Sequence, residues 1–338
     1  MHDLRTRLVA LMAAFTDELI QSVDLLAESG SSRKYYRLHT NNKTYIATLG
    51  SDVRENEAFV SFSNHFERAG IPVPKVYACS SDRSLYIQED IGDVNLYQFL
   101  PAEGELHTDD LFGKYLSSIK VLVQLHTVGS VGFDFDTCYP ASAFDGQGVL
   151  WDLEYFKYFF LKLNDLVYDE YTLQEELFLL RDKAMEIDQP CFMMRDFQSR
   201  NIMIKSGEPM LIDYQGGRRG PYQYDLVSLL WQAKANLPIK WKEDLYTFYV
   251  QELGKTVEID HHRFEQGYWL FVLIRSMQVL GAYGLRGVVQ RKEHFLKSIP
   301  FAINNLNYLF EFKSEFIPQI PAIESAFRQY LNKMKHEQ

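Results

Sequence analysis

The chain has 338 residues, of which 46% are hydrophobic and 24% are charged. This composition is typical of a globular protein and argues against wholesale disorder, a coiled coil or a small disulfide scaffold. The formal net charge is −10, which makes non-specific binding to nucleic acids or anionic membranes a poor match. At about 150 residues per domain, the length predicts two domains or lobes.

The cysteines and the apolar runs favour a cytoplasmic protein. The chain has three cysteines, Cys79, Cys138 and Cys191. They are far apart in the sequence and form no C-x-x-C motif, which argues against a disulfide framework or a zinc site. Such cysteine usage is typical of proteins in a reducing compartment. Acidic residues at 17 and 18 interrupt the first apolar stretch, so no signal peptide is predicted. The longest strongly apolar run, 268–274, is far too short to span a bilayer.

Strand patterns dominate the first ninety residues. A helix is predicted at the start, because apolar residues recur at helical spacing: Leu4, Leu8, Leu11, Phe15 and Leu19. Five segments are predicted as strands: 22–27, 34–40, 44–49, 76–79 and 85–89. Asn41 and Asn42 favour a hairpin turn, and a helix over 54–69 ends before Gly70. Residues 1–90 are therefore predicted to form a five-stranded sheet with one main helix.

Helical periodicity dominates the rest of the chain. The predicted helices are 109–126, 150–162, 173–185, 221–234, 240–253, 263–283, 304–310 and 322–335. A β-rich insert is predicted inside this part, with strands 191–194, 202–204 and 210–212 and a turn over 206–209. We therefore predict an α+β fold of two lobes, a small β-rich lobe (1–90) and a larger, mainly helical lobe (91–338). A cleft between two such lobes is a natural ligand site.

The β-rich insert contains the strongest functional signal. Asp196 and Asn201 are five residues apart between two apolar strands, and Asp213 follows twelve residues after Asn201. Phosphoryl transfer needs one carboxylate that orients the attacking hydroxyl, and a second carboxylate with an amide oxygen that holds Mg²⁺. The spacing alone is weak, because two turn-forming residues around a loop would look the same. The flanking strands and Asp213 together make the interpretation specific.

The segments RDFQSRNIMI, LIDYQGGRRGPYQYDLVSLL and LIRSMQVLGAYG resemble the aminoglycoside phosphotransferase and choline kinase superfamily. Its members are small-molecule kinases with a protein-kinase-like fold. Within it, the segments are most similar to the bacterial sugar kinases that phosphorylate the anomeric hydroxyl of N-acetylmuramate and N-acetylglucosamine in cell-wall recycling. The resemblance extends from about residue 27 to about residue 310. It implies an ATP- and Mg²⁺-dependent kinase that transfers the γ-phosphoryl group to an amino-sugar hydroxyl.

By position, the resemblance implies a role for each residue of the insert. Asp196 matches the catalytic aspartate, and Asn201 and Asp213 match the two metal-holding positions. Asp225 matches an aspartate that braces the catalytic loop. His126 matches a histidine that we interpret as buried and hydrogen-bonded rather than catalytic.

The resemblance also implies a nucleotide site in the N-terminal lobe. The phosphate-covering loop corresponds to Gly30, Ser31, Ser32, Arg33 and Lys34, although an ordinary β-turn has the same composition. Glu57 matches the helix glutamate that pairs with a strand lysine. The adenine-binding hinge corresponds to Gln88, Glu89 and Asp90, through its backbone.

Two departures from the family pattern stand out. The phosphate-binding lysine expected near Ala47 or Thr48 is absent, and its charge could come from Arg33, Lys34 or Lys43. Met194 replaces a histidine that mostly braces the loop, so its loss need not abolish the chemistry.

The acceptor is the least defined part of the prediction. Candidate acceptor-binding residues are Glu154, Arg200, Arg218 and Arg275, with Arg219 and Trp151 nearby. Arginine can bind a carboxylate with two hydrogen bonds, but each of these residues could equally be a surface or helix-capping charge. The acceptor could instead be an aminoglycoside, choline or ethanolamine. The missing lysine also leaves open a catalytically weak nucleotide-binding protein, and the oligomeric state stays open.

Overall fold

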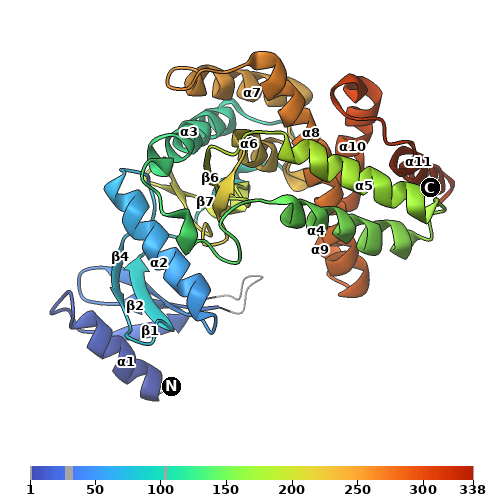
Figure 1. Ribbon diagram of the computed structural model, residues 1–338. Coiled ribbons are helices and arrows are strands. Elements are labelled where there is room, and N and C mark those ends of the chain that lie inside the picture. Colours follow the sequence, from blue (N-terminus) through green and yellow to red (C-terminus); the bar gives the residue numbers. More distant parts are fainter. Residues whose placement is uncertain (1, 27–32, 103–104, 338) are drawn as a thin grey trace. The chain divides into compact units, whose positions relative to one another are not determined.

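The computed structural model describes residues 2–26, 33–102 and 105–337 (Figure 1). Contacts divide the chain into two compact units. Unit 1 comprises Met1–Ser142 and Met194–Arg218, and unit 2 comprises Ala143–Met193 and Arg219–Gln338. The division predicted at residue 90, between a nucleotide-binding lobe and a helical lobe, stays a prediction. None of the helices in the described ranges is long and apolar enough to cross a membrane.

Unit 1 contains an antiparallel sheet of five strands, as predicted. The strands are β1 (Ser22–Leu25), β2 (Lys34–His39), β3 (Thr44–Leu49), β4 (Val76–Cys79) and β5 (Leu85–Glu89). Their order in the sheet is β1-β2-β3-β5-β4, so the hairpin predicted at Asn41 and Asn42 joins two neighbours. Pairing of Ala47 with Ile87 sets the register of the two central strands.

The two faces of this sheet are covered by different helices, because side chains alternate along each strand. Leu85 and Ile87 pack with Leu8 and Met12 of α1 (His2–Met12). Between them, Tyr86 points to the other face and stacks on Phe59 of α2 (Val53–Arg68), with ring centroids 5.1 Å apart. The sheet therefore lies between α1 and α2 (Figure 1).

The first helix is shorter than predicted. It ends at Met12, and the chain turns there, with the backbone N–H of Phe15 donating to Met12. Phe15 then stacks on Tyr77 at 5.0 Å and meets Tyr45 edge-on at 5.5 Å. Phe15, which continues the helical spacing, therefore packs in an aromatic cluster and not in a helix.

The remaining elements of unit 1 are α3 (Asp109–His126), β7 (Ile202–Lys205) and β8 (Glu208–Leu211). The bounds of α3 are those predicted, with Thr108 as its N-cap. β7 and β8 form a hairpin whose turn residues, Ser206 and Gly207, both have positive φ. This is a two-residue turn, so the predicted turn over 206–209 is too long. His126 is buried, as expected.

Unit 2 is mainly helical. Its helices are α4 (Gly146–Phe156), α5 (Glu170–Met185), α6 (Tyr222–Leu230), α7 (Ile239–Leu253), α8 (His261–Tyr283), α9 (Glu293–Leu296), α10 (Ile299–Phe312) and α11 (Pro321–Glu337). α8 is buried along most of its length and contacts α4, α6 and α10. Gly281 allows the close approach of α4, since a Cβ there would lie 2.6 Å from the Tyr155 backbone. α6 ends four residues earlier than predicted, because the chain leaves the helix at Trp231.

The insert contains one strand that was not predicted. β6 (Cys191–Met193) pairs with β9 (Arg218–Gly220) in a sheet separate from the β7–β8 hairpin. The sequence Arg218-Arg219-Gly220 lacks apolar alternation, so this strand depends on pairing with β6 and not on a pattern of its own residues.

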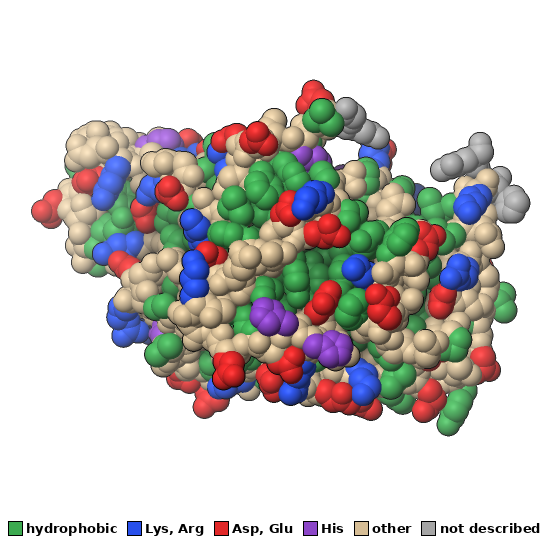
Figure 2. Space-filling view, turned by 90° about the horizontal axis from the view of Figure 1, so that it is seen from above, with side chains coloured by type: hydrophobic (Ala, Val, Ile, Leu, Met, Phe, Trp, Pro, Cys, Tyr) green, Lys and Arg blue, Asp and Glu red, His purple; other side chains and the backbone are tan. Residues whose placement is uncertain are grey.

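On the face shown in Figure 2, basic side chains are interspersed with acidic ones among the described residues and do not gather into a basic patch.

Candidate active site

The loop between β6 and β7 is closed by its own hydrogen bonds. The side-chain amide of Asn201 donates to the backbone oxygen of Asp196 at 2.9 Å, and the Asn201 N–H donates to the Gln198 oxygen at 2.8 Å. Arg195, directly before Asp196, has φ of +72°, a left-handed conformation that costs free energy for a non-glycine residue. The loop is therefore a tightly wound support that presents Asp196.

Asp213 lies beside this loop at the end of β8. The N–H of Ile212 donates to the Asn201 oxygen at 3.1 Å and so joins the strand end to the loop. Gln215 donates to one carboxylate oxygen of Asp213 at 2.8 Å. Asp213 also has a left-handed backbone, with φ of +64°. Its position is therefore fixed by the backbone and by a neighbouring side chain.

The pKa of Asp213 responds to burial and to the charges around it, including that of Asp196. The side chain of Asp213 reaches solvent, yet partial burial by surrounding protein raises its pKa, and the charge of Asp196 raises it further. The Gln215 hydrogen bond and the charges of Arg33 and Arg200 act in the opposite direction. Two carboxylates that repel each other at one place are suited to a shared cation.

Tyr214 anchors this site to α2. Its ring stacks on Phe59 at 5.0 Å, with an interplanar angle of 8°, and its hydroxyl lies 2.6 Å from the Ser63 hydroxyl. Tyr214 is almost fully buried. Sequence analysis did not identify Tyr214 or its partners, although an aromatic residue directly after Asp213 was a usable signal.

A buried cation lies near the carboxylates. Arg33 is only 4% exposed, and its guanidinium lies 2.6 Å from the Glu55 carboxylate. Asp52 caps α2 by accepting from the Glu55 N–H at 3.2 Å, and so places Glu55 in the first helical turn. The charge of Arg33 also acts on Asp213, whose pKa it lowers.

The other cations considered for this role lie elsewhere. Lys34 is exposed, and the ammonium of Lys43 lies over the Tyr45 ring at 4.9 Å. Glu57, which the sequence matched to the ion-pairing glutamate, is exposed and approaches Arg83 only to 4.0 Å. The helix glutamate that pairs closely with a buried cation is Glu55.

The side chains at the expected hinge are used to brace it. Gln88 is buried in β5, and Glu89 forms an ion pair with Lys205. Asp90 accepts from Arg37 at 2.7 Å, and the same guanidinium binds Asp93 at 2.8 Å. Recognition of a base by the backbone at this segment stays a prediction. Gly30, Ser31 and Ser32 of the expected phosphate loop lie outside the described residues.

The candidate acceptor residues fall in both units. In unit 1, Arg200 is exposed near Asp213, while Arg218 is buried and donates to the Gly216 oxygen at 3.1 Å. In unit 2, Arg275 is buried and donates to Gln278 at 3.0 Å. Glu154, also in unit 2, is half-buried on α4. Unit 1 alone brings together Asp196, Asn201, Asp213, Arg33 and Arg200.

Asp225 belongs to unit 2 and is fully buried on α6. Burial raises the pKa of the Cys191 thiol, and the charge of Asp225 raises it further, so the two side chains are neighbours. This environment agrees with a structural role for Asp225 rather than a role in direct contact with substrate.

The donor set fits a magnesium ion held partly by phosphates. Asn201 uses its amide N–H in the loop, and its amide oxygen accepts no hydrogen bond within the described part of the chain. Together with the Asp213 carboxylate it provides the oxygen ligands that Mg²⁺ prefers. The described residues contain no cluster of three His, Cys, Asp or Glu side chains that could hold a metal ion by themselves. Few protein ligands are normal where nucleotide phosphates complete the coordination.

Comparison with known proteins identifies the family. A family model described as the phosphotransferase enzyme family matches residues 23–263. N-acetylmuramate/N-acetylglucosamine kinase from Neisseria meningitidis is 23% identical over 305 residues, which cover 86% of each chain.

Solved structures share the fold. Choline kinase from Cryptosporidium parvum has a TM-score of 0.61 at 14% identity, covering 88% of this chain and 91% of that one. Spectinomycin phosphotransferase in complex with ADP and spectinomycin has a TM-score of 0.57 at 13% identity, covering 92% and 98%. The chain therefore belongs to the phosphotransferase enzyme family, with the predicted α+β fold, and is a phosphotransferase that acts on a hydroxyl group.

Proposed function

We propose that the protein transfers the γ-phosphoryl group of ATP, with Mg²⁺, to a hydroxyl of an amino sugar of the N-acetylmuramate or N-acetylglucosamine type. The observation that carries the proposal is the convergence of Asp196, Asn201 and Asp213 on one hydrogen-bonded loop and the adjoining strand end. The Neisseria meningitidis relative, named for these two sugars, supports the acceptor class. The complex of spectinomycin phosphotransferase with ADP supports an adenine nucleotide.

In the proposed reaction, Asp196 accepts a hydrogen bond from the acceptor hydroxyl and holds it in line with the γ-phosphoryl group. Asn201 and Asp213 hold Mg²⁺, which neutralises charge on the phosphates when it is bound. The transition state is loose, so these residues contribute mainly by positioning and by fixed charge.

Arg33 supplies the positive charge that the third strand lacks. It is buried, it has a carboxylate partner in Glu55, and its charge acts on Asp213. A guanidinium held in this way can donate two hydrogen bonds to phosphate oxygens. This role for Arg33 removes the main reason to regard the chain as a catalytically weak nucleotide-binding protein.

An aminoglycoside or a choline-type acceptor is the alternative. The acidic net charge and the fold shared with choline kinase favour a cationic acceptor, whereas the sugar kinase relative favours the amino sugar. Fold alone does not define the acceptor.

The proposal is tested by ³¹P NMR of the protein with Mg-ATP and either N-acetylmuramate or N-acetylglucosamine. We expect a new phosphomonoester resonance that is absent with Asp196→Asn, and its coupling to the anomeric proton identifies a sugar 1-phosphate. Product with choline or an aminoglycoside, and none with either sugar, would replace the sugar assignment.

A further inference from the structure

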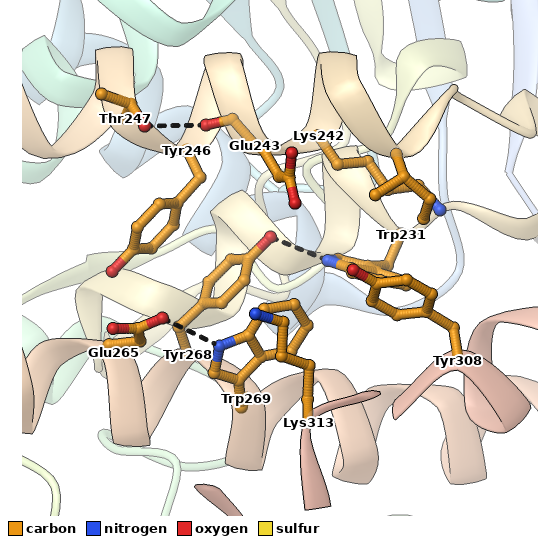
Figure 3. Close-up of a pocket in the computed structure, with 11 residues that line it drawn as sticks. Trp231, Lys242, Glu243, Tyr246, Thr247, Glu265, Tyr268, Trp269, Tyr308 and Lys313 are labelled. Atoms are coloured by element: carbon orange, nitrogen blue, oxygen red, sulfur yellow. Dashed lines mark hydrogen bonds between the residues drawn. The ribbon is translucent and has the colours of Figure 1, made fainter. Parts of the chain in front are cut away.

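Unit 2 contains a pocket that none of the residues proposed for phosphoryl transfer lines. Its volume is about 250 Å³. α7 provides Lys242, Glu243, Tyr246 and Thr247, the first half of α8 provides Glu265, Tyr268 and Trp269, and Trp231, Ile239, Tyr308 and Lys313 complete the wall (Figure 3). The acceptor candidate Arg275 lies further along α8, and Glu154 lies on α4. The pocket therefore shares no lining residue with the candidate site described above.

The floor of the pocket is preformed. Trp231, Tyr268 and Trp269 are buried, and the indole N–H of Trp231 donates to the Tyr268 hydroxyl at 2.7 Å. The indole N–H of Trp269 donates to the Glu265 carboxylate at 3.3 Å. The two indoles meet edge-on with centroids 5.6 Å apart. Rings held in this way keep their faces in place without a ligand.

Each of the two indole rings already has a lysine of the chain over it. The ammonium of Lys242 lies 4.0 Å from the Trp231 ring, and that of Lys313 lies 5.0 Å from the Trp269 ring. A cationic ligand at these rings would be repelled by the Lys313 ammonium and by Lys242 wherever Lys242 is protonated. The pocket is therefore poorly suited to a quaternary ammonium or amine ligand.

The charges on the wall nearly cancel. Glu243, at the exposed mouth, and Glu265 oppose the two lysines, and neither lysine has an ion-pair partner among the described residues. Lys242 is buried and donates to Asn305 at 3.0 Å, and burial lowers its pKa to about 7. Near neutral pH the lining therefore carries no excess positive charge that would favour an anion.

An uncharged sugar matches a pocket with aromatic walls and nearly balanced charges. The C–H face of a pyranose packs on aromatic rings, and its hydroxyls can donate to carboxylates and accept from ammonium groups. Pockets for drug-sized ligands usually measure about 300–1,000 Å³, so this smaller pocket suits a single ring.

We propose that the pocket lined by Trp231, Tyr308 and Glu243 is a non-catalytic binding site for an uncharged monosaccharide. Tyr246 and Tyr308 flank the ring, Glu243 and Glu265 accept from its hydroxyls, and Lys313 donates to an oxygen at the opposite side (Figure 3). The proposal does not rest on the identity of the phosphoryl acceptor.

The four tryptophans provide a site-specific test, because two of them line the pocket and Trp151 is exposed on α4. Glucose and N-acetylglucosamine are titrated into ¹⁵N-labelled protein without nucleotide, and the indole N–H signals are assigned with single Trp→Phe variants. We expect saturable shifts at Trp231 and Trp269 with at least one of the two sugars. Tyr308→Ala and Glu243→Gln should each weaken this binding about tenfold, whereas Glu258→Gln, a change at another exposed glutamate, leaves it unchanged.

Three results would overturn the proposal. The first is that neither sugar shifts Trp231 or Trp269. The second is that shifts occur at Trp151 alone and are insensitive to Tyr308→Ala, which would mean that the sugar binds elsewhere. The third is that choline or acetate shifts Trp231 and Trp269 at lower concentration than either sugar. Failure of the proposed kinase reaction is separate, because it is measured as phosphorylated product and not as indole shifts.

Discussion

The guanidinium of Arg33, the residue directly before β2, lies 2.6 Å from the carboxylate of Glu55 in the first turn of α2. The position of the cation is therefore set by an ion pair with a helix, although β3 carries no lysine. Ala47 and Thr48, where that lysine was expected, are fully buried. A cation from another segment of the chain can replace the β3 lysine, because phosphate binding requires a positive charge near the phosphates and not a particular strand position.

Replacement of Arg33 tests this role. Arg33→Ala should lower kcat/KM for Mg-ATP by about 10²-fold, since one fixed electrostatic donor is removed. Arg33→Lys should recover only part of the loss, because an ammonium lacks the two-pronged geometry of the guanidinium. Steady-state kinetics measure both, with Lys34→Ala as the control at the neighbouring exposed cation. Equal effects of the Arg33 and Lys34 alanine variants would contradict the assignment.

Asp196→Asn should abolish phosphoryl transfer, with a loss of about 10²–10⁴-fold or more, because the amide cannot accept the hydroxyl proton. The hydrogen bonds that Asp196 makes to Gln198 and Asn201 use its backbone oxygen, so they survive the substitution. Circular dichroism and Mg-ATP affinity should therefore stay close to those of the wild type. Near-normal turnover would remove Asp196 from the mechanism.

Asp213→Asn should weaken Mg-nucleotide binding and, without nucleotide, stabilise the fold near neutral pH. The pKa of Asp213 is raised in the folded protein, so its ionised form costs stability once the pH exceeds that raised value. The variant's advantage should shrink as the pH falls through the raised folded-state pKa, and should be lost below the unfolded pKa of about 3.9, where both states are protonated.

The choice of asparagine at this position matters. Asp213 has φ of +64°, which asparagine tolerates well and alanine does not. Asp213→Ala should therefore be less stable than Asp213→Asn, although both lose the carboxylate that we propose as a metal ligand. Thermal unfolding at several pH values separates the charge effect from the backbone effect. An Asp213→Asn variant less stable than the wild type near pH 7 would show that the ionised carboxylate is not destabilising.

Glu176→Ala should lower the free energy of unfolding by about 1–2 kcal/mol. The buried Glu176 carboxylate accepts from the N–H groups of Ala322 and Ile323, at 2.7 and 2.8 Å, and so caps the start of α11. Urea denaturation measures the effect, with Glu175→Ala as the control at the adjacent exposed position. A similar loss in both variants would mean that the cap contributes nothing specific.

Local pattern predicted much of the fold. β3, β4, β5 and α3 have the predicted bounds, because alternation or helical spacing, with turn or capping residues at the ends, defines each of them. β9 was missed, since its strand character depends on its partner and not on its own residues.

In the candidate site, too, local features could be predicted and contacts between distant residues could not. The loop that joins Asp196 to Asn201 follows from spacing, whereas the pairing of Arg33 with Glu55 depends on where two side chains point after packing. Sequence analysis therefore indicated Glu57, which is two residues from Glu55. Any contact of Glu57 with nucleotide stays a prediction. The pocket between α7, α8 and α10 could not be anticipated, because its lining comes from distant segments that look like ordinary core.

The stack of Tyr214 on Phe59 couples the stability of α2 to the position of Asp213. Opening of the middle turns of α2 must break this stack and the contact of Tyr214 with Ser63, and Tyr214 is joined directly to Asp213. We therefore expect a cation bound at Asp213 to slow the exchange of amide protons in α2 with solvent deuterium. Amide exchange in α2 would then report whether a cation is bound at Asp213.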